Sequence, residues 1–335
     1  MTAPRRFLLN IVLPLAALTA AVGSFFLEHR AVPVAPEPAA RTVRIGFLPN
    51  LTHAQPLLAS QRGDFARALE GTAVEFRTFN AGPAVIEALL SGELDLAYVG
   101  PSPALNAFAR SGGAEVRVIA GAAANGVSVV TRPGSGIRRL DDLAGRRLAT
   151  PQWGNTQDIA ARTFLAANPA AARGTTLVNA ENPDIFALFQ RGDLDAAWVP
   201  EPWASRLVLE AGGDRLAEEK DLWTDRRFAV TLVVARRGFL EANPGVIRRF
   251  LDAHATLTEW LRAHPAEGSA AANDALRALT GKPLPEPVLR EAWPRVEFTT
   301  DLLSDSIREQ ARRAVAIGFI PRLPPLSPLF AESLP

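Results

Sequence analysis

Short apolar runs alternate with longer amphipathic segments along most of the chain from residue 42 onward. Runs such as Val43–Leu48, Val74–Phe79 and Leu94–Val99 predict buried strands. Between them, Leu57–Leu69 and Pro83–Leu90 carry apolar residues at helical spacing. Strands and helices that alternate at these lengths predict mainly parallel sheets with helices on both faces. The fold class is therefore predicted to be α/β.

One strand–turn–helix segment occurs twice in the chain. The stretch SGELDLAYVGPSPALNAFARSGG occupies residues 91–113, and RGDLDAAWVPEPWASRLVLEAGG occupies residues 191–213. Both copies contain Gly-x-Leu-Asp near their start and Gly-Gly at their end. A unit used twice, far apart in one chain, predicts two similar lobes, and the cleft between two lobes is a common place for a small-molecule ligand.

The pattern of strands and helices restarts after Asn125, which predicts an inserted second lobe. We expect the strong β segment Phe228–Ala235 to pair with Val127–Thr131 and to lead the chain back to the first lobe. Because an inserted lobe requires two crossings, a hinge that closes around a ligand is expected. The predicted boundaries are 42–125 for the first part of lobe one, 126–243 for lobe two, 244–321 for C-terminal helices of lobe one, and 322–335 for a Pro-rich tail.

The N-terminus has the pattern of an export signal. Arg5 and Arg6 precede Phe7–Leu27, which contains no charged residue and is long enough to span a bilayer. Residues 1–30 are therefore predicted to be a signal peptide or an N-terminal membrane anchor, and both interpretations stay open. Residues 31–41, with three prolines, predict a semi-stiff linker. We expect a periplasmic or otherwise extracytoplasmic protein.

Composition narrows the possible functions. Hydrophobic residues make up 48% of the chain, which is enough for a large core, and the net charge of +1 gives no reason to expect a nucleic-acid partner. The absence of Cys excludes disulfides, thiolate catalysis and thiolate metal ligands. The chain also lacks a Gly-rich phosphate loop with its Lys, a Gly-x-Ser-x-Gly elbow and a His-Glu-x-x-His motif. We expect no enzyme activity, no cofactor and no metal site.

Candidate binding residues lie where predicted strands end and helices begin. In parallel α/β sheets, ligands bind outside the carboxyl ends of the strands. Here these ends are rich in Gly, Pro, Ser, Thr and Asn, which leave backbone N–H groups free at helix N-termini. Such ends can bind an anion although the protein supplies no Lys or Arg there. The candidate ligand-binding residues are Asn50, Thr52, His53, Gly82, Gly100, Ser102, Trp153, Asn155, Thr156, Gln157, Asn182, Glu201 and Trp203.

Several of these residues also have a purely structural interpretation. Ser102, Asn155 and Asn182 are residue types that cap helices, and His53 has no partner motif. Trp153 and Trp203 follow strand ends, where each is either a wall for the ligand's organic tail or a packing residue between lobes. Glu201 is expected to hold a ligand amine, to bridge to the first lobe or to face solvent.

These residues carry a resemblance to a known family. The segments Tyr98–Ala104 and Pro151–Asp158, with Gly145–Ala149 and Leu194–Trp203, resemble periplasmic substrate-binding proteins of ABC transporters. The resemblance spans about residues 42–321 and is closest to the aliphatic-sulfonate members of the nitrate/sulfonate/taurine group. The lipid-anchoring Cys of many such proteins is absent here.

The resemblance implies a bilobal type II periplasmic-binding-protein fold with a ligand trapped between the lobes. It also implies delivery of that ligand, an aliphatic sulfonate or taurine, to an inner-membrane ABC permease with its ATPase. Alternative ligands are nitrate, bicarbonate or a pyrimidine or thiamine precursor, and an alternative role is a membrane-tethered sensory module. Thiamine-pyrimidine synthases share the resemblance, but the chain lacks the Cys-rich motif on which their iron chemistry depends.

Overall fold

The computed structural model of the protein describes residues 40–331. The predicted export segment and nearly all of the predicted linker lie outside the described residues, as do the last four residues of the tail. Within residues 40–331, no helix combines the length and apolar character needed to cross a membrane.

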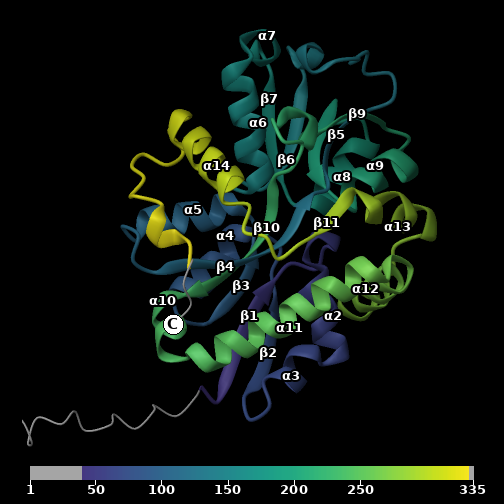
Figure 1. Cartoon of the computed structure of the whole chain (residues 1–335). Coiled ribbons are helices and arrows are strands. Elements are labelled where there is room, and N and C mark those ends of the chain that lie inside the picture. Colours follow the sequence, from purple (N-terminus) through teal and green to yellow (C-terminus); the bar gives the residue numbers. More distant parts are fainter. Residues whose placement is uncertain (1–39, 332–335) are drawn as a thin grey trace, which may run out of the picture. The chain divides into compact units, whose positions relative to one another are not determined.

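Two mixed β-sheets form the framework of the described region (Figure 1). In each sheet, three parallel strands are followed by antiparallel strands on one side. The six-stranded sheet has the order β11 (Val296–Phe298), β4 (Val116–Asn125), β10 (Ala229–Arg236), β3 (Leu96–Val99), β1 (Thr42–Phe47) and β2 (Ala73–Thr78). The five-stranded sheet has the order β7 (Thr176–Ala180), β6 (Arg147–Pro151), β8 (Ala196–Pro200), β5 (Val127–Thr131) and β9 (Asp214–Glu218).

Helices connect the parallel strands and cover both sheets (Figure 1). The α-helices are α2 (Ala54–Arg62), α3 (Asp64–Ala68), α4 (Gly82–Leu90), α5 (Pro101–Arg110), α6 (Thr156–Ala167), α7 (Pro169–Ala172), α8 (Asn182–Gln190), α9 (Trp203–Ala211), α10 (Arg237–Ala242), α11 (Pro244–Ala263), α12 (Pro265–Thr280), α13 (Glu286–Ala292) and α14 (Ser304–Ala316). Short 3-10 helices are η1 (Leu51–His53), η2 (Leu140–Leu143), η3 (Glu219–Leu222), η4 (Trp293–Arg295) and η5 (Ser327–Leu329). The single helix expected over Leu57–Leu69 is divided between α2 and α3 at Gly63, whose φ is 73°.

The expected pairing of Phe228–Ala235 with Val127–Thr131 is wrong. Strand β10 instead lies between β3 and β4 and is antiparallel to both. The apolar run predicts a buried strand, but a fully buried strand carries no pattern that identifies its neighbour. Residues 229–236 therefore belong to the six-stranded sheet, whereas the predicted second lobe extended to residue 243. The chain passes between the sheets at Asn125–Gly126 and through residues 219–228.

The shared Asp of the repeated segment holds neighbouring strands together. Asp95 Oδ2 accepts a hydrogen bond from Arg44 N at 3.0 Å, and Asp195 Oδ2 accepts one from Arg147 N at 2.9 Å. Both carboxylates also pair with guanidinium groups, Asp95 with Arg44 and Asp195 with Arg132. The shared Asp is thus explained by strand attachment rather than by ligand chemistry.

We expect the Asp95→Ala substitution to destabilise the protein by about 2 to 3 kcal/mol, because hydrogen bonds to a buried charge are lost and their donors remain. The Asp95 side chain is 2% exposed and that of Asp195 is 19% exposed, so Asp195→Ala should cost less. Urea denaturation of both variants measures the difference. Equal losses for the two variants would contradict this explanation.

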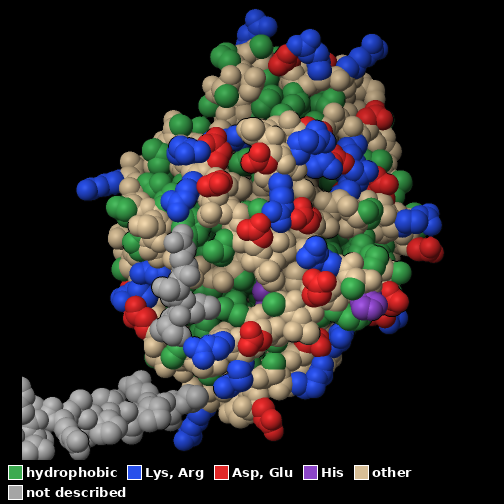
Figure 2. Space-filling model, in the orientation of Figure 1, with side chains coloured by type: hydrophobic (Ala, Val, Ile, Leu, Met, Phe, Trp, Pro, Cys, Tyr) green, Lys and Arg blue, Asp and Glu red, His purple; other side chains and the backbone are tan. Residues whose placement is uncertain are grey.

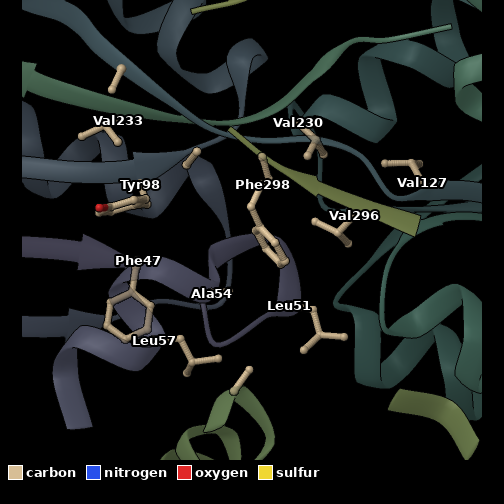
Figure 3. Close-up of a cluster of buried hydrophobic side chains, with 14 of the residues drawn as sticks. Phe47, Leu51, Ala54, Leu57, Tyr98, Val127, Val230, Val233, Val296 and Phe298 are labelled. Carbon is tan, nitrogen blue, oxygen red and sulfur yellow. The ribbon is translucent and has the colours of Figure 1, made fainter. Parts of the chain in front are cut away.

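The core of the six-stranded part combines side chains from several strands with the segment after β1. Figure 3 shows Phe47, Tyr98 and Val233 from the sheet near Leu57 of α2. Tyr98 is fully buried, and its hydroxyl lies 2.9 Å from His254 Nδ1, while His254 Nε2 lies 2.8 Å from the carbonyl oxygen of Gly121. Because a carbonyl only accepts, His254 carries its proton on Nε2, and its Nδ1 accepts a hydrogen bond from the Tyr98 hydroxyl.

We expect His254 to make the protein less stable as the pH falls from about 6.5 to about 4. Burial lowers the pKa of His254 to about 4, whereas an unfolded His titrates near 6.5. Between these two pH values the unfolded chain binds a proton at His254 that the folded chain does not bind. Acidification through this window therefore removes about 3 kcal/mol of stability that the neutral His254 imidazole contributes at higher pH.

Burial also lowers the pKa of His53 to about 3 and raises that of Glu219 to about 7, so both groups titrate in the same window and the His254 contribution is isolated by urea denaturation of the wild type and of His254→Gln across this pH range. The His254→Gln variant should have a shallower slope than the wild type, the exposed His264→Gln variant should keep the wild-type slope, and equal slopes in all three proteins would contradict the assignment.

On the face drawn in Figure 2, charged side chains are not segregated by sign, and Lys and Arg lie among Asp and Glu. This face therefore shows no single-sign patch of the kind that binds nucleic acid, in agreement with the net charge of +1 of the chain.

Candidate functional site

Four helix N-termini meet at one small cavity between the two sheets. Its lining includes the first residues of α4, α6 and α8, which are Gly82, Thr156 and Asn182, and the residue before α5, which is Gly100. In none of the four helices does the side chain of the N-cap residue accept a hydrogen bond from the helix's own first N–H groups. N–H groups that their own N-cap side chains leave uncapped, and the positive ends of four helix dipoles, therefore surround the cavity.

The cavity is small and its lining is neutral. Its volume is 40 Å³, which is room for roughly three water molecules. The remaining lining residues are Leu48, Asn50, Thr52, His53, Asn80, Pro151, Asn155, Gln157, Pro200 and Val230, and none of the residues named for this lining is Lys, Arg, Asp or Glu. Such a site favours a compact anion that is held by dipoles and hydrogen bonds rather than by an ion pair.

Side chains from the five-stranded part hydrogen-bond the helix N-termini of the six-stranded part. Asn155 Oδ1 accepts a hydrogen bond from Gly82 N at 3.2 Å, and Thr156 Oγ1 accepts a weaker one from Ser102 N at 3.4 Å. The approach is close, because a Cβ added at Gly100 would lie 2.3 Å from Thr156 Oγ1. These two oxygens thus occupy places at α4 and α5 that an anion's oxygens would also favour.

Two amide side chains of the cavity lining have unused acceptors. The Oδ1 atoms of Asn50 and Asn182 are buried, and neither has a hydrogen-bond partner among residues 40–331. A buried acceptor without a partner is costly, so a bound water or ligand donor would lower the free energy here.

His53 lines the cavity as a neutral ring. Burial lowers its pKa to about 3. Leu48 N lies 3.4 Å from His53 Nδ1, and since an N–H group only donates, Nδ1 is the acceptor and Nε2 carries the proton. His53 therefore offers a hydrogen-bond donor rather than a positive charge.

The structure brings nine of the sequence-predicted residues to this cavity and places four elsewhere. The nine are Asn50, Thr52, His53, Gly82, Gly100, Asn155, Thr156, Gln157 and Asn182. Of the other four, Ser102 is 2% exposed and reaches the interface through its backbone N–H. Trp153 is 60% exposed and lies against Phe319, with the Arg162 guanidinium 4.1 Å above its ring. Trp203 lines a separate groove.

Glu201 does not line the cavity, and of the three roles considered for it the structure supports the bridge to the first lobe, since Arg295 Nε lies 3.9 Å from its Oε1. Its carboxylate is fully buried and accepts hydrogen bonds from Arg215 Nη1 at 3.1 Å and from Ser205 N at 3.0 Å. Burial raises the pKa of Glu201, and the Arg215 charge opposes this increase. Its acceptors are thus already used within the protein.

The buried carboxylate of Asp158, which we did not predict, supports the loop before α6. It accepts hydrogen bonds from Gly154 N at 3.0 Å, from Asn179 Nδ2 at 2.8 Å and from Arg162 Nε at 2.9 Å. Asp158 lies four residues after Gly154 and belongs to the stretch that carries the family resemblance, which is the one signal that pointed to it. It fixes the backbone that presents Asn155 and Thr156.

Residues 36–275 match the model of the NMT1-like family. The chain belongs to this family. Over 202 residues it is 29% identical to the taurine-binding periplasmic protein of Escherichia coli (strain K12), an alignment that covers 59% of this chain and 61% of that relative. The match thus spans less than two thirds of the relative's length.

Solved structures of similar fold support the same architecture. The alkanesulfonate-binding protein SsuA from Xanthomonas axonopodis pv. citri bound to MOPS superposes with a TM-score of 0.70 at 22% identity, covering 88% of this chain and 99% of that chain. The periplasmic aliphatic sulphonate binding protein SsuA from Escherichia coli gives a TM-score of 0.71 at 21% identity, covering 87% and 92%. The fold is therefore the bilobal one of these binding proteins.

Proposed function

We propose that this NMT1-like protein is the solute-binding component of an ABC importer. It captures a small organic sulfonate in the interlobe cavity and delivers it to an inner-membrane permease that works with an ATPase. The observation that carries the proposal is the meeting of four helix N-termini at one neutral cavity. The names of the similar binding proteins support a periplasmic location, which agrees with the export pattern in residues 1–30.

A sulfonate suits this site for three physical reasons. It is a permanent anion, so it gains from helix dipoles at any physiological pH. Its three oxygens accept several hydrogen bonds, which the N–H groups at α4, α5 and α6 and the His53 ring can donate. Its oxygens also match the volume of roughly three water-sized groups. A buried Lys or Arg, with its own desolvation cost, is then unnecessary.

Ligand binding adds to the contacts that already join the two lobes. Sulfonate oxygens accept hydrogen bonds from the N–H groups of α4, α5 and α6 that the Asn155 and Thr156 side chains do not use, and the lobes stay closed around the ligand. For a ligand with an amine, such as taurine, Asn50 Oδ1 and Asn182 Oδ1 supply the acceptors, a role that was one of three considered for Glu201.

A thermal-shift screen tests the ligand class. Ethanesulfonate and taurine should raise the melting temperature in proportion to the logarithm of their concentration, because each binds only the folded state. Nitrate, bicarbonate and a thiamine-type pyrimidine serve as comparison ligands. A clear shift with one of these and none with any sulfonate would overturn the proposal.

A further inference from the structure

A second hollow lies beside the anion cavity and is much larger. It is a groove of 370 Å³, within the usual range for small-molecule sites. Its apolar lining includes Pro49, Pro183, Pro202, Trp203, Leu276 and Leu284. These residues belong to the loop after β1, to the starts of α8 and α9, and to α12 with the loop that follows it.

The groove and the cavity share three loops. Pro49 lines the groove and Asn50 lines the cavity; likewise Pro183 lines the groove and Asn182 the cavity. At the third loop, Pro200 faces the cavity and Pro202 the groove. Along all three loops, the residue that lines the groove is thus one or two positions from the residue that lines the cavity.

Because the cavity is small and the groove is large, the oxyanion head and the organic tail of a ligand would lie in different hollows. The cavity has room for an oxyanion head and little more. An organic tail of several carbons must lie outside it, and the groove is an adjoining apolar space that both sheets' loops border. The Trp203 ring is half-buried there, with the Arg206 guanidinium 4.7 Å from its centre.

We propose that the groove is a tail-binding subsite that makes the protein selective for sulfonates with an extended alkyl or aromatic tail, with Trp203 as its specificity-determining residue. This inference rests on the proposed function, since the sulfonate head occupies the anion cavity. Of the two tryptophans first considered for this role, Trp203 lines the groove, whereas Trp153 is on the exposed surface beside Phe319.

The tail chemistry follows from the lining. Apolar surface and an aromatic ring favour methylene chains and flat rings through burial of apolar area. The groove also carries charged groups, Lys282 and the Arg206–Glu210 pair, whose side-chain nitrogen and oxygen are 2.7 Å apart. A neutral tail leaves this pair intact, so tails without a carboxylate or a second sulfonate are the expected ligands.

Isothermal titration of the full chain with four sulfonates tests the subsite. Hexanesulfonate and naphthalene-2-sulfonate should bind at least tenfold more tightly than ethanesulfonate and taurine. The Trp203→Ala variant should lose most of that gain and bind ethanesulfonate within about twofold of the wild type. Trp203→Phe should restore much of the gain, because a ring again lines the groove.

The Trp153→Ala variant is the matched control and should keep the wild-type preference for long tails. If Trp203→Ala fails to fold, Lys282→Trp provides the second test, since it adds a bulky ring at an exposed lining position and should alter long-tail binding alone.

Binding of ethanesulfonate with no gain for longer tails would overturn the subsite and leave the proposed function standing. Loss of the gain in Trp153→Ala and not in Trp203→Ala would also overturn it. Failure of every sulfonate to bind would overturn the proposed function itself.

Discussion

The Asp158→Ala variant is expected to lose about 3 to 5 kcal/mol of folding free energy, because one partner of a buried ion pair is removed. Asp158 is fully buried, and its carboxylate satisfies Gly154 N, Asn179 and Arg162 at once. Without it, these donors lose their common acceptor, and the loop that presents Asn155 and Thr156 is no longer fixed. Urea denaturation gives the loss in stability, and titration with ethanesulfonate gives the accompanying loss in affinity.

The matched control for this variant is Asp193→Asn. Asp193 also pairs with an arginine, Arg191, at 3.0 Å, but their side chains are 44% and 60% exposed. Exposed pairs contribute less than about 1 kcal/mol, so this control should remain close to the wild type. A loss below 1 kcal/mol in Asp158→Ala would show that the carboxylate does not support the loop as described.

The Gly100→Ala variant should weaken sulfonate binding on the order of 1,000-fold while leaving each lobe folded. Gly100 has a φ of −69°, which any residue adopts, so the added methyl group causes no backbone strain. Its Cβ would instead lie 2.3 Å from Thr156 Oγ1, which prevents the lobes from closing. The ligand then loses the donors of one lobe, a cost of about 4 kcal/mol.

Three measurements separate blocked closure from general damage in Gly100→Ala. Small-angle scattering should show a larger radius of gyration than in the wild type. The double variant Gly100→Ala/Thr156→Ala should recover the compact form, because the clashing hydroxyl is gone. Gly245→Ala, at a helix position with open space around its Cβ, should match the wild type in affinity. Wild-type sulfonate affinity in Gly100→Ala would contradict the closure model.

Local patterns predicted the elements, but the tertiary partners could not be predicted from them. The repeated Gly-x-Leu-Asp segments indicated two similar lobes, and the strand ends indicated most of the residues that line the cavity. The partner of β10 was predicted wrongly, since its side chains are buried on both faces and carry no alternating pattern.

The site residues illustrate the same limit. Glu201 follows a strand end, as ligand-binding residues often do, but its partner Arg215 is on strand β9, which local spacing does not relate to it. Asn155 is a residue type that caps its own helix, yet its Oδ1 accepts from Gly82, on a distant helix of the other lobe. That contact exists only because the lobes approach each other, which no single segment encodes.

The most direct test of the anion site is a ¹H–¹⁵N NMR titration of the full chain with ethanesulfonate. The amide signals of Gly82, Ser102 and Thr156 should shift together and saturate at one dissociation constant, while that of Gly245 stays in place. The uncharged isostere ethyl methyl sulfone should produce none of these shifts at the same concentrations. Saturable ethanesulfonate binding that leaves the Gly82, Ser102 and Thr156 amides unchanged would contradict the conclusion that the helix N-termini hold the anion.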